Sequence, residues 1–262
     1  MRIKLDLILL VLWIGDKGYF GSGASSPTDP QHIYFSRSKD NGIAWEDKHD
    51  ITHFIYSVLC TECLLAFALL VKDHENKERN YFPYTNDFGE TWSAFIDFPF
   101  TNSNEAELVE LNNVSLLLSI RQPQTRKFAM TDSLGSHWDW ADYMPDVIDP
   151  GCKGEIKRYT SVIDGYEKDR LIHSIAYNKN SRKNVTLMVS YDEGKTWPHK
   201  RSLQLEASTY STFDIDKNGN ILVLYEESSW PGSSTAVYDI VFANVTLEWI
   251  TYVKIVFKNL KN

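Results

Sequence analysis

One eight-residue pattern, Ser/Thr-x-Asp-x-Gly-x-x-Trp, recurs along this chain of 262 residues. We call it the Asp box. It is complete at residues 38–45, 85–92 and 190–197, and the copy at 131–138 has Ser133 in place of the aspartate. Successive tryptophans of the pattern are 47, 46 and 59 residues apart. A period of this length is typical of arrays in which one small structural unit is repeated and stacked on its neighbours.

Each position of the Asp box suits a turn between two strands. Asp and Ser side chains accept hydrogen bonds from backbone amides a few residues further on, which closes a turn locally. Glycine supplies the positive φ that a tight hairpin needs. The tryptophan begins the next strand and offers a large apolar surface to pack beneath the turn. The boxes therefore predict hairpins, and their direct role is structural.

The composition indicates an all-β protein. Hydrophobic residues make up 43% of the chain and aromatic residues 13%, which is enough for a full core. Apolar runs are short, as at 171–175, 185–189 and 221–225, and turn residues flank them, which favours strands over helices. We predict one β-propeller domain over residues 1–262. A repeat of about 47 residues gives five to six blades, and propellers of four to eight are known.

Charge and cysteine content argue against several functions. The net charge of −8 is unfavourable for binding polyanions, so nucleic acid is not an expected partner. Cys60 and Cys63 have metal or redox spacing, but no second pair completes a zinc site. We interpret them and Cys152 as ordinary thiols. His49 and His53 lie in no convincing helix, so we expect no metal there.

The Asp boxes resemble those of the sialidases (neuraminidases), and four further segments extend the resemblance over roughly residues 30–243. Residues 105–121 look like the stretch in which the family's functional glutamate precedes an arginine by sixteen positions. Residues 181–187 lead into the last box as the family's third arginine segment does. Residues 207–212 look like its nucleophile segment, and residues 224–226 like its closing Tyr-Glu strand. The chain is similar to lysosomal-type animal and bacterial exo-sialidases.

This resemblance implies a six-bladed β-propeller with catalytic residues at its centre. Tyr210 is then the nucleophile and Glu105 its base, whereas Arg121 and Arg182 bind the substrate carboxylate. Sialic acid carries that carboxylate on its anomeric carbon, and the planar fork of arginine makes two charge-assisted hydrogen bonds to it. A neutral tyrosine suits this substrate, and sialidases are a known tyrosine exception among glycosidases. A phenol of pKa about 10 needs a base at neutral pH.

Each assignment has an alternative. Arg121 at a strand end and Arg182 in a polar loop are also compatible with surface charges, and Tyr210 with a strand cap. Glu107 lies on the same strand face as Glu105 and competes with it for the role of base.

Two elements of the family pattern are harder to find. Its first arginine and its acid/base aspartate would fall at Arg2 and Asp29, but residues 34–42 fit the family's second blade better. The first blade is then missing or incomplete. Glu226, preferred to Glu227 because it follows a tyrosine, would hold that first arginine by an ion pair.

The resemblance implies an exo-α-sialidase that removes terminal sialic acid from glycoproteins, glycolipids or oligosaccharides without a metal or organic cofactor. Its activity depends on the missing elements, because loss of a general acid removes about 10²–10⁴ in rate. Two alternatives stay open: a catalytically impaired sialic-acid-binding propeller, and an Asp-box scaffold for protein interactions.

The N-terminus permits two interpretations. Arg2 and Lys4 precede an apolar run at 7–14 that resembles a signal-peptide core, although Asp6 interrupts it. A first strand is the alternative, and the run is too short for a transmembrane span. Three sequons permit glycosylation on the secretory route, and they begin at Asn113, Asn184 and Asn244. We expect a lysosomal or extracellular protein, with a cytoplasmic one left open.

Overall fold

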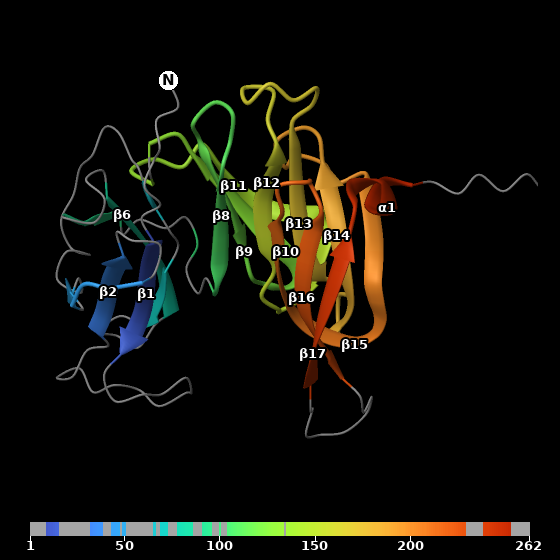
Figure 1. Ribbon diagram of the computed structural model, residues 1–262, viewed down its shortest axis with the longest axis horizontal. Coiled ribbons are helices and arrows are strands. Elements are labelled where there is room, and N and C mark those ends of the chain that lie inside the picture. The colour runs from blue at the N-terminus through green and yellow to red at the C-terminus, as the bar shows by residue number, and fades with distance from the viewer. Residues whose placement is uncertain are drawn as a thin grey trace, which may run out of the picture. The chain divides into compact units, whose positions relative to one another are not determined.

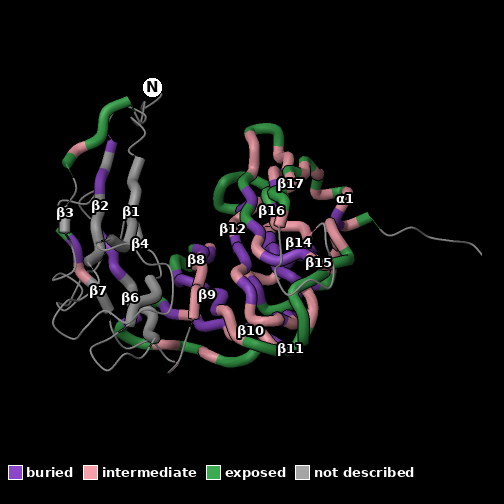
Figure 2. Tube along the Cα trace, turned by 90° about the horizontal axis from the view of Figure 1, so that it is seen from below, coloured by how far each residue is buried: buried purple, intermediate pink, exposed green. Residues whose placement is uncertain are grey.

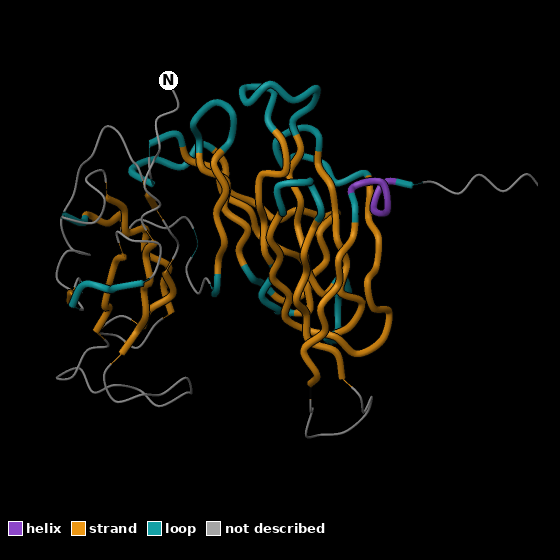
Figure 3. Tube along the Cα trace, in the orientation of Figure 1, coloured by secondary structure: helices purple, strands orange, loops and turns teal. Residues whose placement is uncertain are grey.

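The computed structural model describes part of the chain. The described residues are 9–15, 32–38, 43–47, 49–50, 65–66, 69–72, 78–85, 91–95, 100, 104–133, 135–228 and 238–252. Strands dominate them, and the one helix in these ranges is short, so the all-β prediction is confirmed (Figures 1 and 3). The chain forms two compact units, Met1–Ala106 with Thr131–Trp140 and Glu107–Met130 with Ala141–Asn262. The prediction of a single domain over residues 1–262 concerns how these units associate, and it stays a prediction.

The first unit contains two small sheets. One has the order β1 (Leu9–Gly15), β2 (His32–Ser38) and β3 (His49–Asp50). The other has the order β4 (Leu65–Ala66), β6 (Glu78–Thr85) and β5 (Leu69–Lys72), with β7 (Ser93–Phe95) paired to β6. The apolar run near the N-terminus thus contributes strand β1, which pairs antiparallel with β2.

Two larger sheets make up most of the second unit. The first has four strands: β8 (Ala106–Glu110), β9 (Leu116–Ile120), β10 (Pro123–Thr131) and β11 (Trp140–Pro150). The second has six strands in chain order: β12 (Glu155–Thr160), β13 (Arg170–Ala176), β14 (Lys183–Ser190), β15 (His199–Ile215), β16 (Ile221–Ser228) and β17 (Tyr238–Val245). Helix α1 (Leu247–Thr251) follows β17.

Strand β15 links two blades of the second unit. Its first part pairs with β14, from His199 opposite Val189 to Ala207 opposite Lys183. Its second part pairs with β16, ending with Ile215 opposite Ile221. One long strand therefore closes one blade and opens the next, which suits the radial repetition of a propeller.

The blade of β12–β14 is buried on both faces (Figure 2). Leu171 belongs to a hydrophobic cluster shared with β8–β11, whereas the adjacent Ile172 belongs to a cluster shared with β15–β17 and α1. Met188 and Val189 divide between the clusters in the same way. Because successive side chains of a strand point to opposite faces, this blade is an inner layer between two others.

The last Asp box forms the expected hairpin. The Oγ of Ser190 accepts from the amide of Gly194 over 2.9 Å, and Asp192 accepts from the amide of Thr196 over 2.8 Å. Gly194 has a φ of +82°, which glycine adopts without strain. Trp197 is 1% exposed and packs in the cluster beneath the turn.

The box at 131–138 shows why serine substitutes for aspartate. The Oγ of Ser133 accepts from the amide of His137, four residues on, as Asp192 does in the last box. In the first two boxes the aspartate and the glycine lie outside the described residues. Trp92 is buried as expected, but Trp45 is 43% exposed, so the predicted packing is wrong for the first box.

Candidate functional site

Tyr210 lies at an irregularity in the pairing of β15 with β16. Ser208 pairs with Glu227 and Ser211 with Tyr225, so Thr209 and Tyr210 together oppose a single residue of β16. Such a bulge bends a strand and redirects its side chains, and bulges are frequent beside active sites. Here Thr209 is buried, whereas Tyr210 is half-buried.

Two arginines from other strands converge on this tyrosine. Arg121 follows β9, and its Nη1 donates to the phenol oxygen of Tyr210 over 3.4 Å. Arg182 precedes β14, and its guanidinium carbon lies 5.3 Å from the centroid of the Tyr210 ring. The Nη2 of Arg182 also donates to the backbone oxygen of Gly151 over 3.5 Å. The structure thus brings together three of the five site residues predicted from the sequence.

The charges of this cluster suit an anion. A guanidinium over an aromatic face is attracted to the ring and held beside it. Arg182 is exposed, and no carboxylate of the described residues pairs with it. Its guanidinium is open to solvent beside the ring of Tyr210, and a planar fork of this kind can bind a carboxylate.

Glu226 is the residue of β16 that opposes the bulge. It is half-buried, and within the described ranges its carboxylate makes neither a hydrogen bond nor an ion pair. Glu227 differs, because its two carboxylate oxygens accept hydrogen bonds from Gln204 and from the hydroxyl of Tyr225. The predicted partner of Glu226, Arg2, lies outside the described residues, and so does Asp29. The supporting role of Glu226 stays a prediction.

Glu105 belongs to the first unit, whereas the other four predicted site residues belong to the second. Its assignment as the base of Tyr210 therefore stays a prediction. The competing Glu107 lies in the second unit and forms an ion pair with Lys153, with 3.0 Å between Nζ and Oε1.

A buried polar cluster behind the site was missed by the sequence analysis. Arg126 is fully buried, and its Nη1 forms an ion pair with Asp149 over 2.9 Å. Ser119 and His173 extend this cluster, because the Oγ of Ser119 lies 2.7 Å from both the Nε of Arg126 and the Nε2 of His173. The Asp-Pro-Gly run at 149–151 signals a turn, but nothing in the sequence pairs that aspartate with Arg126.

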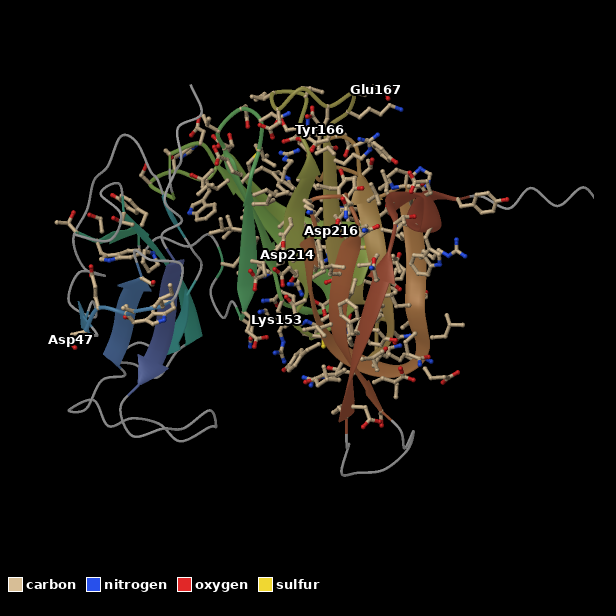
Figure 4. The ribbon with its side chains drawn as sticks, viewed as in Figure 1. Asp47, Lys153, Tyr166, Glu167, Asp214 and Asp216 are labelled. Carbon is tan, nitrogen blue, oxygen red and sulfur yellow. The ribbon has the colours of Figure 1, made fainter. Side chains whose placement is uncertain are left out.

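The site lies far from the last Asp box. Lys153, which follows the turn that contacts Arg182, lies toward one end of the second unit in Figure 4, and Tyr166 and Glu167 lie at the other. Strand β14 runs from Arg182 to the last Asp box, and its eight residues span about 23 Å. The last Asp box and the site therefore lie at opposite ends of β14.

Comparison with known proteins decides the family. The BNR repeat-like domain family matches residues 19–223, a range that includes all four Asp boxes. This chain is a BNR-repeat protein of the sialidase family. The predicted relationship is confirmed, and so is the propeller architecture that the family shares.

Individual sialidases are similar to this family member over much of its length. A sialidase of Bacteroides fragilis is 24% identical over 75% of this chain and 39% of its own length. A sialidase of Micromonospora viridifaciens is 29% identical over 64% of this chain and 25% of its own. The structure of Hadza microbial sialidase Hz136 has a TM-score of 0.72 at 21% identity, covering 93% of this chain and 50% of that one. The chain thus spans half or less of these relatives.

Neither a metal site nor a membrane-spanning helix occurs in the part of this BNR-repeat chain that the structure describes. None of its described groups of His, Cys, Asp and Glu side chains has the arrangement to hold a metal ion. None of its described helices has the length and hydropathy to cross a bilayer. Cys60 and Cys63 lie outside the described residues.

Proposed function

We propose that this chain is an exo-α-sialidase that removes terminal sialic acid from glycoconjugates with retention of configuration. The observation that carries the proposal is the convergence of Arg121 and Arg182 on Tyr210. These residues come from three different strands or their ends. A phenol flanked by two arginines fits a substrate whose reacting carbon carries a carboxylate.

In the proposed reaction the two arginines hold the substrate carboxylate, and the phenol oxygen of Tyr210 attacks the anomeric carbon. The bond from that carbon to the leaving sugar oxygen breaks, and an acid protonates this oxygen. Glu105 takes the phenol proton. Water then attacks the same carbon and gives a proton to the group that served as the acid. The bond to the tyrosine oxygen breaks, Glu105 returns the proton to Tyr210, and two displacements at one carbon restore its configuration.

The acid and a third arginine are required to complete this scheme, and Asp29 and Arg2 are the proposed candidates. A second candidate function follows from the sequence, in which residues 34–42 fit the family's second blade better than its first. A propeller that lacks the first arginine and the acid would bind sialic acid without cleaving it. The same surface would then act as a sialic-acid-binding site.

The test is hydrolysis of a fluorogenic sialoside by the wild type and by Tyr210→Phe. We expect the variant to lose a factor of about 10³ or more in kcat, as expected when a nucleophile is removed. Tyr166→Phe is the matched control, because Tyr166 is 56% exposed and lies at the opposite end of the unit. Equal rates for wild type and Tyr210→Phe would remove Tyr210 from the mechanism.

A ligand-binding measurement distinguishes the second candidate function from the first. A wild type that binds 2-deoxy-2,3-didehydrosialic acid but hydrolyses no sialoside supports the binding propeller. A wild type that does neither contradicts both candidates and favours a scaffold for protein interactions.

A further inference from the structure

The carboxylate of Asp149 contacts the residue after Arg121 and the turn at 149–152. Its Oδ1 accepts from the amides of Gly151 and Cys152, each over 2.8 Å. Its Oδ2 accepts from the amide of Gln122, over 3.4 Å, and Gln122 directly follows Arg121. One side chain thus links the end of β9 to the turn at 149–152.

That turn contacts Arg182 and the residue that precedes Tyr210. The backbone oxygen of Gly151 accepts from the Nη2 of Arg182 over 3.5 Å. The Sγ of Cys152 lies 2.9 Å from the Oγ1 of Thr209, the bulge residue that precedes Tyr210. Gly151 has a φ of +81°, which favours glycine at this position.

Arg126 forms a buried ion pair with Asp149. It is 0% exposed, and its Nη1 donates to Asp149 over 2.9 Å and to the backbone oxygen of Cys152 over 2.7 Å. Its Nε donates to the Oγ of Ser119 over 2.7 Å. Both partners of the pair have fully buried side chains. Burying two charges costs about as much as their attraction returns, so a pair of this kind is poorly explained by stability alone.

We propose that Arg126 and Asp149 are positioning residues that set the relative placement of Arg121, Arg182 and Tyr210. They act through the turn at 149–152 and through Thr209, and do not touch the substrate. This inference rests on the proposed function, because the placement of Arg121, Arg182 and Tyr210 affects catalysis only if these residues carry out the proposed reaction. A displacement of about 1 Å in such groups lowers the rate about 10²-fold.

The experiment compares Asp149→Asn and Thr209→Val with a matched control, Glu193→Gln. Glu193 forms a bidentate pair with Arg158 at the opposite end of the unit, over 2.5 and 2.6 Å. Each variant is assayed for kcat and KM on a fluorogenic sialoside at a temperature where its near-ultraviolet circular dichroism is native. Fluorotyrosine incorporated at position 210 reports the surroundings of that ring by ¹⁹F NMR, whether or not the chain is active.

We expect kcat to fall by about 10²-fold in Asp149→Asn, with a smaller fall in Thr209→Val and a shifted ¹⁹F resonance in both. Thr209→Ser keeps the hydroxyl, so we expect its kcat and its ¹⁹F resonance to match those of the wild type. Glu193→Gln lowers the melting temperature but leaves kcat and the resonance unchanged. If Asp149→Asn does not fold, Thr209→Val still tests the positioning role, because it removes only the uncharged contact between Thr209 and Cys152.

Two failures are distinguishable. A native resonance and an unchanged kcat in Thr209→Val would overturn the positioning role while leaving the proposed function intact. A wild type that neither cleaves the sialoside nor binds 2-deoxy-2,3-didehydrosialic acid would overturn the proposed function, and the ¹⁹F shifts would still decide whether Asp149 positions Tyr210.

Discussion

Arg121 donates a hydrogen bond to the phenol oxygen of Tyr210 over 3.4 Å, although 89 residues separate the two in the chain. Arg121 follows β9, and Tyr210 lies in β15, so two different sheets supply the pair. The contact places a fixed positive charge at the atom that we propose as the nucleophile.

Replacing the arginines by lysine tests whether the planar fork is needed. Arg121→Lys and Arg182→Lys keep the positive charge but lose the second hydrogen bond to a carboxylate. We expect each to lower kcat/KM for a sialoside by about 10-fold to 10²-fold, the value of a hydrogen bond to a charged group. Lys195→Ala, an exposed change in the last Asp box, serves as the control. Unchanged kinetics in both lysine variants would contradict carboxylate binding here.

His173 predicts a pH-dependent stability. Burial, with Arg126 nearby, lowers the pKa of His173 well below its usual 6.5. Below about pH 6.5 the unfolded chain therefore binds a proton that the folded chain excludes, and stability falls as pH decreases, by up to about 1.4 kcal/mol per pH unit.

Urea unfolding between pH 5 and pH 8 measures the effect of His173. His173→Gln keeps a polar group near Ser119, the partner of Nε2, and we expect a flatter pH profile than in the wild type. Parallel profiles for the two proteins would show that His173 does not titrate on unfolding.

The tryptophans of the Asp boxes predict unequal effects on stability. Trp197→Ala removes a side chain that is 1% exposed, and we expect it to cost about 3–5 kcal/mol through the cavity it leaves. Trp45→Ala removes one that is 43% exposed, and a change near the surface typically stays within about 0.5 kcal/mol. Chemical unfolding of both variants checks the difference, and equal losses would contradict it.

The burial of Cys152 predicts that its thiol is protected from alkylation in the native protein. Burial raises its pKa, which outweighs the opposing effects of the hydrogen bond with Thr209 and of Arg182. The thiol is also 0% exposed, so we expect iodoacetamide at pH 7.5 to leave it unmodified in the native protein and to modify it after unfolding. Mass spectrometry of the peptide that contains residue 152 reads the result, and rapid native modification would contradict the packing.

The sequence predicted the fold well because the Asp box carries its own turn chemistry. The hydrogen bonds of Ser190 and Asp192 join residues within four positions, so local pattern is enough to expect them. The proximity of Arg121, Arg182 and Tyr210 came only from resemblance to a family, because no local rule joins residues on separate strands. Their catalytic roles stay predictions.

The buried contacts that hold the site residues in place could not be predicted from local sequence patterns. The pairing of Arg126 with Asp149 depends on how β10 lies against the end of β11, and the bulge at Thr209 depends on the register of β15 with β16. Such features follow from tertiary packing, and the sequence shows only single polar residues within strands. The exposed Trp45 likewise shows that a shared motif does not ensure equal packing.

Covalent trapping tests the central claim most directly. A 2,3-difluorosialic acid reagent slows breakdown of the glycosyl intermediate, so the intact mass of an active retaining sialidase rises by one sugar residue. We predict this increase in the wild type, located by peptide mass spectrometry on Tyr210, and no increase in Tyr210→Phe. An unmodified wild type, or an adduct on any other residue, would contradict the account.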